Sequence, residues 1–127
     1  MERVTGIGGI FFKAKDPKVL AAWYQEHLGV YFGDGTYTQF KWINPHHPTE
    51  PGSTVFSFFK EQTTYLDPSK KDYMINFRVK DLKGLLSQLQ KDGVTVVGEV
   101  QEFEYGKFGW ILDLEGNKIE LWEPPKE

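Results

Sequence analysis

The segment YGKFGWILDLEGNKIELWEPP, residues 105–125, shows most clearly how this chain folds. Two apolar runs, 108–112 and 119–122, flank a turn-forming segment, which predicts two antiparallel strands joined by a short loop. Within the second run stands Glu120, and alternation along a strand places it on the face opposite its two apolar neighbours. A carboxylate on that face needs water, a partner or a chemical role.

Composition limits the class of protein. The 127 residues are enough for one domain, 1–127, with a proper core. With 15 Lys and Arg against 18 Asp and Glu, the net charge is -3, which argues against nucleic acid as a partner. Cysteine is absent, and no apolar run approaches the ~18 residues of a membrane span. The first residues carry no signal-peptide pattern, so we expect a soluble cytoplasmic protein.

The first half of the chain predicts a strand, a helix and three further strands. The run 7–14 is apolar without a helical period and is expected to be a strand. Asp16 suits a helix N-cap, Pro17 the first helical position and Gly29 a helix end, so we predict a helix over 17–28. Further strands are expected at 30–32, 36–43 and 54–60, with a proline-rich loop at 44–52.

The second half repeats this order after a polar connection at 61–71. A strand at 72–80 alternates with a period of two and places Met74, Asn76 and Arg78 on one face. The elements that follow are a helix between its cap Asp81 and its end at 92–93, then strands at 94–97, 106–112 and 118–122.

The two halves match each other. Asp16 and Asp81 open the two helices, and Gly29 and Gly93 close them, at nearly equal offsets. Such self-similarity marks a duplicated βαβββ unit. We therefore predict an α+β fold in which two curled mixed sheets surround a cleft, with one helix behind each. Repeat one covers about 5–66 and repeat two about 72–123.

Three stretches resemble one known family. They are KDPKVLAAWYQEHLGV at 15–30, NFRVKDLKGLLSQL at 76–89 and DLEGNKIELWEP at 113–124. Together they resemble the vicinal oxygen chelate superfamily, which includes glyoxalase I, bleomycin-resistance proteins and extradiol dioxygenases. The resemblance covers nearly the whole chain and implies the same fold. It says less about a reaction, because one fold hosts many functions.

In metal-dependent members, the resemblance implies ligands from the first and last strands of each repeat, usually His, Gln or Glu. These positions fall on Gly9, Ser57, Met74 and Glu120, of which only Glu120 has a ligand-type side chain. A divalent cation such as zinc needs three or more N or O donors from the protein. We therefore predict no family metal centre and no cofactor.

Without a metal, Glu120 is a candidate general base, a hydrogen-bond acceptor for a ligand, or the partner of a cation. By the topology that the resemblance implies, Arg78 lies on the neighbouring strand and would pair with Glu120 while gripping a carboxylate or phosphate. The other candidate ligand-binding residues share the concave face: Asn76, Ser57, Lys13, Phe11, Met74 and Trp122. Lys13 could equally lie in solvent, and some of the rings must belong to the core.

The chain also has two adjacent histidines and lacks the usual nucleophile motifs. His46 and His47, in the sequence NPHHP, could bind stray zinc but have no nearby carboxylate except Glu50. They are better explained as surface residues. The chain has no cysteine and no GxSxG nucleophile elbow, which excludes those forms of covalent catalysis.

The sequence thus predicts a protein that binds a small, anionic and partly aromatic ligand without a metal. Bleomycin-resistance-type members, which the chain resembles, work by sequestration, usually as homodimers. An acidic cleft formed by Glu120 with Glu99, Glu102 and Glu104 would instead suit a cationic drug. The alternative is a glyoxalase-like lyase or isomerase with Glu120 as general base and Arg78 or Asn76 as oxyanion partner. The identity of the ligand, and whether the cleft is shared across a dimer, are left open.

Overall fold

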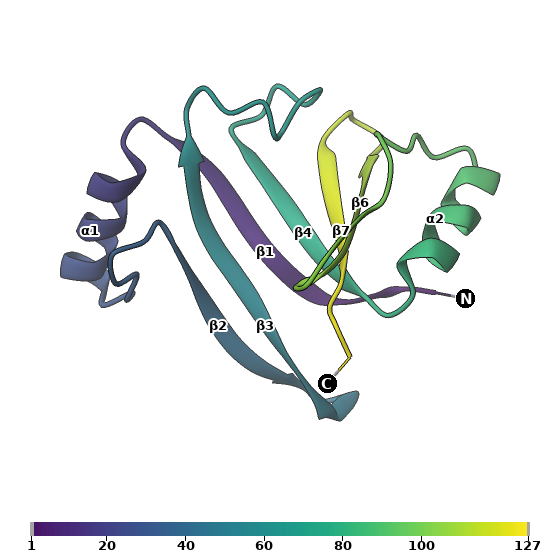
Figure 1. Ribbon diagram of the computed structural model, residues 1–127, viewed down its shortest axis with the longest axis horizontal. Helices are drawn as coiled ribbons and strands as arrows, with labels where there is room; N and C mark the ends of the chain where they lie inside the picture. The colour runs from purple at the N-terminus through teal and green to yellow at the C-terminus, as the bar shows by residue number, and fades with distance from the viewer. Residues whose placement is uncertain (1, 127) are drawn as a thin grey trace.

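The computed structural model describes residues 2–126, without the side chain of His47, and arranges them around one seven-stranded sheet (Figure 1). The strand order is β2-β3-β1-β4-β7-β6-β5. In chain order the elements are β1 (Val4–Ala14), α1 (Pro17–Leu28), β2 (Tyr37–Asn44), β3 (His47–Lys60), β4 (Tyr73–Val79), α2 (Leu82–Lys91), β5 (Gln101–Phe103), β6 (Gly106–Leu112) and β7 (Lys118–Glu123). The predicted α+β class, with a curled mixed sheet and two helices, is confirmed.

The pairing scheme occurs twice. In each half the first strand pairs in parallel with the last, β1 with β3 and β4 with β7. The two halves then join through antiparallel pairing of β1 with β4, so both curl into one continuous sheet. This repetition is what a duplicated unit predicts.

Each helix covers the outer face of its own half. The two N-caps are those predicted, since Asp16 accepts a hydrogen bond from the Val19 amide at 3.2 Å and Asp81 one from the Gly84 amide at 3.1 Å. The helices flank the sheet at its two sides (Figure 1). The outer clusters are Ala14, Ala21, Phe32 and Phe58 under α1, and Val79, Leu82, Leu85, Leu86, Ile111 and Leu121 under α2. Neither helix is long and apolar enough to cross a membrane.

Two predicted strands are absent from the described structure, and a third is longer than expected. In the 30–32 segment, Phe32 packs in the core under α1, and its amide donates a hydrogen bond to Gln25 Oε1 at 2.9 Å. In the 94–97 segment, Val96 forms only an isolated bridge to Ile111, and β5 takes the edge position.

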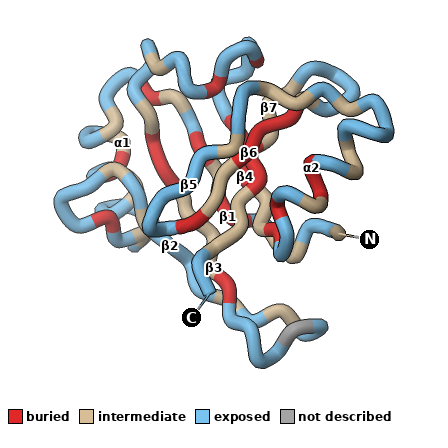
Figure 2. Tube along the Cα trace, turned by 45° about the vertical axis from the view of Figure 1, so that its right-hand side comes forward, coloured by how far each residue is buried: buried red, intermediate tan, exposed pale blue. Residues whose placement is uncertain are grey.

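β3 begins at His47, inside the predicted loop, because its first residues pair on one side only, with β2. Prolines are tolerated in a strand that has an unpaired side. The tip of this hairpin is exposed, whereas the buried stretches follow the central strands (Figure 2).

A third cluster occupies the inner face of the sheet, which we define as the face opposite both helices. Leu66, from the connection between the halves, is fully buried there and packs with Phe11, Met74 and Trp110. The connection was expected to be only a polar link. It fills the cleft, so Phe11 and Met74, predicted as ligand wall, are core residues.

We call this connection, residues 61–71, the plug, and replacing its buried Leu66 tests whether the plug is part of the core. Leu66→Ala should lower the free energy of unfolding by about 2–5 kcal/mol, because a buried leucine leaves a cavity. Urea denaturation measures the change. Leu114→Ala, at an exposed leucine, should shift it by less than about 0.5 kcal/mol. A cost below about 1 kcal/mol for Leu66→Ala would mean that the plug contributes little to folding.

Candidate functional site

Glu120 lies at the centre of the inner face. On β7 its neighbours Ile119 and Leu121 pack toward α2, so alternation turns the carboxylate inward, where the residue is only 2% exposed. The sheet register sets Asn76 of β4 and Trp110 of β6 directly opposite it. Directly opposed residues share a face, which brings their polar atoms within reach.

The Glu120 carboxylate accepts hydrogen bonds from three side chains. Asn76 Nδ2 donates to Oε1 at 2.6 Å, and Trp110 Nε1 donates to Oε2 at 2.9 Å. The hydroxyl of Tyr65, from the plug, also donates to Oε2. A buried charge is tolerated only with such partners, so this cluster satisfies Glu120 without any ligand.

Lys118 and Tyr65 close the cluster on the side of the plug. Lys118 Nζ donates to the Tyr65 carbonyl at 2.5 Å and lies 5.3 Å from the Tyr65 ring centroid and 5.5 Å from that of Trp110. Burial lowers the pKa of Lys118, while the Glu120 charge acts in the opposite direction. The pKa of Tyr65 is raised, first by burial and then by the charge of Glu120. These contacts hold the plug over the carboxylate.

A second row of side chains crosses the inner face two residues farther along the strands. In register, Gly6 of β1, Arg78 of β4, Trp122 of β7 and Phe108 of β6 stand opposite one another. The Arg78 Cζ lies 4.9 Å from the Trp122 ring centroid and 5.8 Å from that of Trp42. Both distances lie within the ~6 Å range of a cation–π interaction.

Trp42 reaches Arg78 because glycines leave room for its ring. A Cβ on Gly6 would come within 2.5 Å of that ring and one on Gly52 within 2.4 Å, so any larger residue would displace it. Trp42 Nε1 donates to Thr54 Oγ1 at 2.8 Å, which in turn donates to the Ile7 carbonyl at 2.6 Å. The indole is therefore fixed in place.

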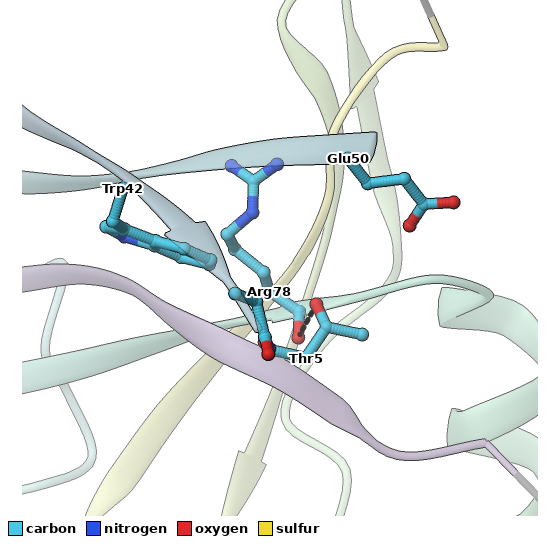
Figure 3. Close-up of a pocket in the computed structure, with 5 residues that line it drawn as sticks. Thr5, Trp42, Glu50 and Arg78 are labelled. Carbon is cyan, nitrogen blue, oxygen red and sulfur yellow. Dashed lines mark hydrogen bonds between the residues drawn. The ribbon is translucent and has the colours of Figure 1, made fainter. Parts of the chain in front are cut away.

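Trp42 and Arg78 border a small pocket, which we call the Arg78 pocket. Its volume is about 50 Å³, and it is lined by Thr5, Trp42, Asn44, Glu50 and Arg78 (Figure 3). In that view Trp42 lies to one side of the Arg78 side chain and Glu50 to the other. Asn44 Nδ2 donates to the Thr5 carbonyl at 3.0 Å, which fixes one wall. The pocket thus presents both a cation and an anion.

Comparison with known proteins agrees with this geometry. The profile of the Glyoxalase/Bleomycin resistance protein/Dioxygenase superfamily matches residues 6–121. The chain belongs to this superfamily. No curated protein matches it significantly in sequence.

Several solved structures of the glyoxalase superfamily fold are similar to this chain. Methylmalonyl-CoA epimerase from Mycobacterium tuberculosis is 23% identical, with a TM-score of 0.62 over 97% of this chain and 90% of that chain. The Streptomyces coelicolor epimerase, a variant in complex with 2-nitronate-propionyl-CoA, is 14% identical, with a TM-score of 0.72 over 98% and 100%. A superfamily member from Vibrio splendidus 12B01 is 12% identical, with a TM-score of 0.54 over 97% and 99%. At these identities the similarity extends to the fold.

The metal implied by the superfamily does not fit the residues present. The four ligand positions do gather on the inner face: Gly9 aligns with Asn76 beside Glu120, and Ser57 and Met74 both align with Phe11. These four residues cannot bind a divalent cation, however. Glu120 is the only charged donor among them, and both of its oxygens already accept hydrogen bonds. Among the side chains that the structure describes, which leave out that of His47, no three His, Asp or Glu gather as a metal site would require.

The structure brings some predicted site residues together and separates others. Asn76 contacts Glu120 as one site, but the expected Arg78–Glu120 pair is wrong, because the register places Trp122, not Glu120, opposite Arg78. Gly8 explains the fit of Asn76, since a Cβ there would come within 2.1 Å of Asn76 Oδ1.

Other candidates lie away from both groups. Ser57 is buried in the inner face. Lys13 pairs with Phe59 near the C-terminal end of β1, whereas Arg78 pairs with Gly6 near the other end of that strand. Glu102 Oε1 lies 3.7 Å from both Lys83 Nζ and Lys107 Nζ, on the α2 side. Glu102 is therefore not available for the acidic cleft that the sequence offered as an alternative. His46 is exposed and its amide donates to Asn44 Oδ1, while the side chain of His47 lies outside the described part of the structure.

Sequence reasoning missed several residues of these groups. Alternation along a strand could have identified Lys118 and Trp110. Lys118 stands two residues before Glu120, and Trp110 stands two residues after Phe108 on the predicted strand 106–112. Tyr65 gave no signal, because the polar connection has no period. Trp42 and Glu50 likewise reach the Arg78 pocket only through the path of the β2–β3 hairpin.

The raised pKa of Tyr65 predicts a pH dependence. Folding raises this pKa above the ordinary value of about 10, so the folded state holds the proton more tightly than the unfolded chain. The stabilisation is complete below about pH 10 and declines as the pH rises further. Between about pH 9 and 11, wild type should lose stability more steeply than Tyr65→Phe in urea denaturation. Tyr31→Phe, at an exposed tyrosine, should keep the wild-type slope. Equal slopes for wild type and Tyr65→Phe would contradict the raised pKa of Tyr65.

Proposed function

We propose that this protein binds a small organic acid, with the acid group at the Arg78 pocket. One observation carries the proposal: the Arg78 guanidinium lies against the Trp42 and Trp122 rings, on the wall of a pocket that Glu50 also lines. A guanidinium carries its N–H donors in a planar fork that matches the two oxygens of a carboxylate.

The walls of the pocket are preformed. Hydrogen bonds fix Trp42 through Thr54 and Asn44 through the Thr5 carbonyl, and Trp122, which contacts Arg78 beside the pocket, donates its Nε1–H to the Tyr105 carbonyl at 2.8 Å. A site that is already ordered loses less conformational entropy when a ligand binds. This supports a binding role for the pocket over a merely structural role for the two indoles.

Glu50 narrows the class of ligand. A carboxylate beside Arg78 disfavours a bare anion but can accept a hydrogen bond from the ligand. The pocket therefore suits an acid group with a hydroxyl or amino group next to it. A volume of about 50 Å³ is far below the ~300–1,000 Å³ of sites for drug-sized ligands, so only this head group would be enclosed.

A lyase or isomerase with Glu120 as general base is less well supported. A general base must come within hydrogen-bond reach of the substrate proton. Glu120 is 2% exposed and carries three donors, one of them from the plug above it. Binding, as in sequestration, needs no such access. A homodimer and a cytoplasmic location stay predictions.

Arg78→Gln tests the proposal. Titration calorimetry with lactate and salicylate, which carry a hydroxyl next to a carboxylate, should show binding to wild type. In Arg78→Gln the affinity should fall at least about 10-fold, as expected when a bidentate charged contact of ~1.5–3 kcal/mol is lost. Arg78→Lys keeps the charge but not the fork, and should lie between the two.

Two further variants serve as controls for charge. Lys80→Gln removes an exposed positive charge just after β4 and should leave the affinity unchanged. Glu50→Gln should tighten the binding of benzoate, which has no hydroxyl to donate, by removing a repulsive charge. Failure of both acids to bind wild type, or equal binding by Arg78→Gln, would overturn the proposed function.

Metal removal gives an independent prediction. Because the donor set around Glu120 does not fit a divalent cation, dialysis against EDTA should leave the affinity for salicylate unchanged. Elemental analysis of protein purified without chelator should find no stoichiometric zinc, nickel or iron. Loss of binding on dialysis, with recovery on adding metal, would contradict a metal-free site.

A further inference from the structure

Aromatic rings continue from the Arg78 pocket across the inner face. Trp122 and the Phe108 ring lie parallel, with centroids 6.0 Å apart and 7° between their planes. Phe108 in turn contacts Tyr105 at 5.6 Å and Phe103 at 6.1 Å. We call these four residues the aromatic row. It begins at Arg78 and ends at the tip of the β5–β6 hairpin.

The far end of the aromatic row is open to solvent. Phe103 is 49% and Tyr105 60% exposed, yet their rings stack at 5.1 Å with 7° between the planes. The plug covers the neighbouring row around Glu120, through Leu66 against Trp110, and Phe108 of the aromatic row packs at the margin of that cluster. The inner face is thus divided into a closed half and an open aromatic half.

Resting on the proposed function, we infer that the ligand is a flat aromatic acid, whose ring system lies along the aromatic row. The Arg78 pocket encloses only a head group, so the body of the ligand must lie outside it. The adjoining surface is aromatic and begins 4.9 Å from the Arg78 Cζ, so acid group and rings can engage at once. Charge complementarity at one end and ring stacking along the rest favour an aromatic acid over an aliphatic one.

The hairpin tip is positioned for this role. The Trp122 Nε1 hydrogen bond to the Tyr105 carbonyl ties the tip to the start of the row. Gly106 makes this approach feasible, because a Cβ there would come within 2.4 Å of Trp122 Nε1 and its φ is +130°. This hydrogen bond, with the ring contacts along the row, places Tyr105 and Phe108 beside Trp122 before any ligand binds.

Matched acids and variants test the inference. For wild type, 3-hydroxy-2-naphthoate should bind at least about 10-fold more tightly than 2-hydroxycyclohexane carboxylate, which has the same head group without a flat ring. The double variant Phe103→Ala, Tyr105→Ala should weaken the naphthoate about 3- to 10-fold and leave the cyclohexane acid unchanged. Tyr31→Ala removes a more exposed ring elsewhere and should change neither affinity.

The outcomes separate this inference from the proposed function. If both acids bind equally and the double variant binds like wild type, the acid site stands and the aromatic row has no role in binding. If neither acid binds wild type, the proposed function fails and the inference fails with it. Because both replaced rings are largely exposed, the double variant should fold, and its urea denaturation midpoint checks this.

Discussion

The buried carboxylate of Glu120 is the constraint on which the inner face depends. An ionised group at 2% exposure is tolerable only with hydrogen-bond donors around it, and three elements supply them: β4 through Asn76, β6 through Trp110 and the plug through Tyr65. Because the plug contributes one of these donors, the carboxylate fixes the path of the connection between the two halves. A polar group at the centre of the sheet thus organises the apolar cluster that closes over it.

This arrangement changes how the superfamily fold is used. The four positions that would hold a metal still meet on the inner face, but three of them cannot supply a charged donor. The space is taken by Leu66, Phe11 and Met74, and the remaining carboxylate is satisfied by neutral N–H and O–H groups and a nearby lysine. The region where the superfamily would hold a metal is here part of the hydrophobic core.

Ligand-binding potential then lies in the row next to it. The two rows differ by two residues along β4, β6 and β7 and by three along β1, where the register shifts between Ile7 and Gly9, so both lie on the inner face. One row is Gly9, Asn76, Glu120 and Trp110; the other is Gly6, Arg78, Trp122 and Phe108. The plug covers the first and leaves the second partly open, with the cation at one end and rings at the other.

The sequence by itself determined the elements that local chemistry specifies. Asp16 and Asp81 cap the helices, period-two alternation marks β4 and β7, and the repeated order predicts the duplicated fold with Glu120 on its inner face. Only the tertiary structure decided which residue meets which. A register that pairs Asn76, not Arg78, with Glu120 depends on how distant strands align, and the paths of the plug and of the β2–β3 hairpin bring Tyr65 and Trp42 into place. Such long-range alignment leaves no local pattern, which is why the composition of each site could not be read from the chain.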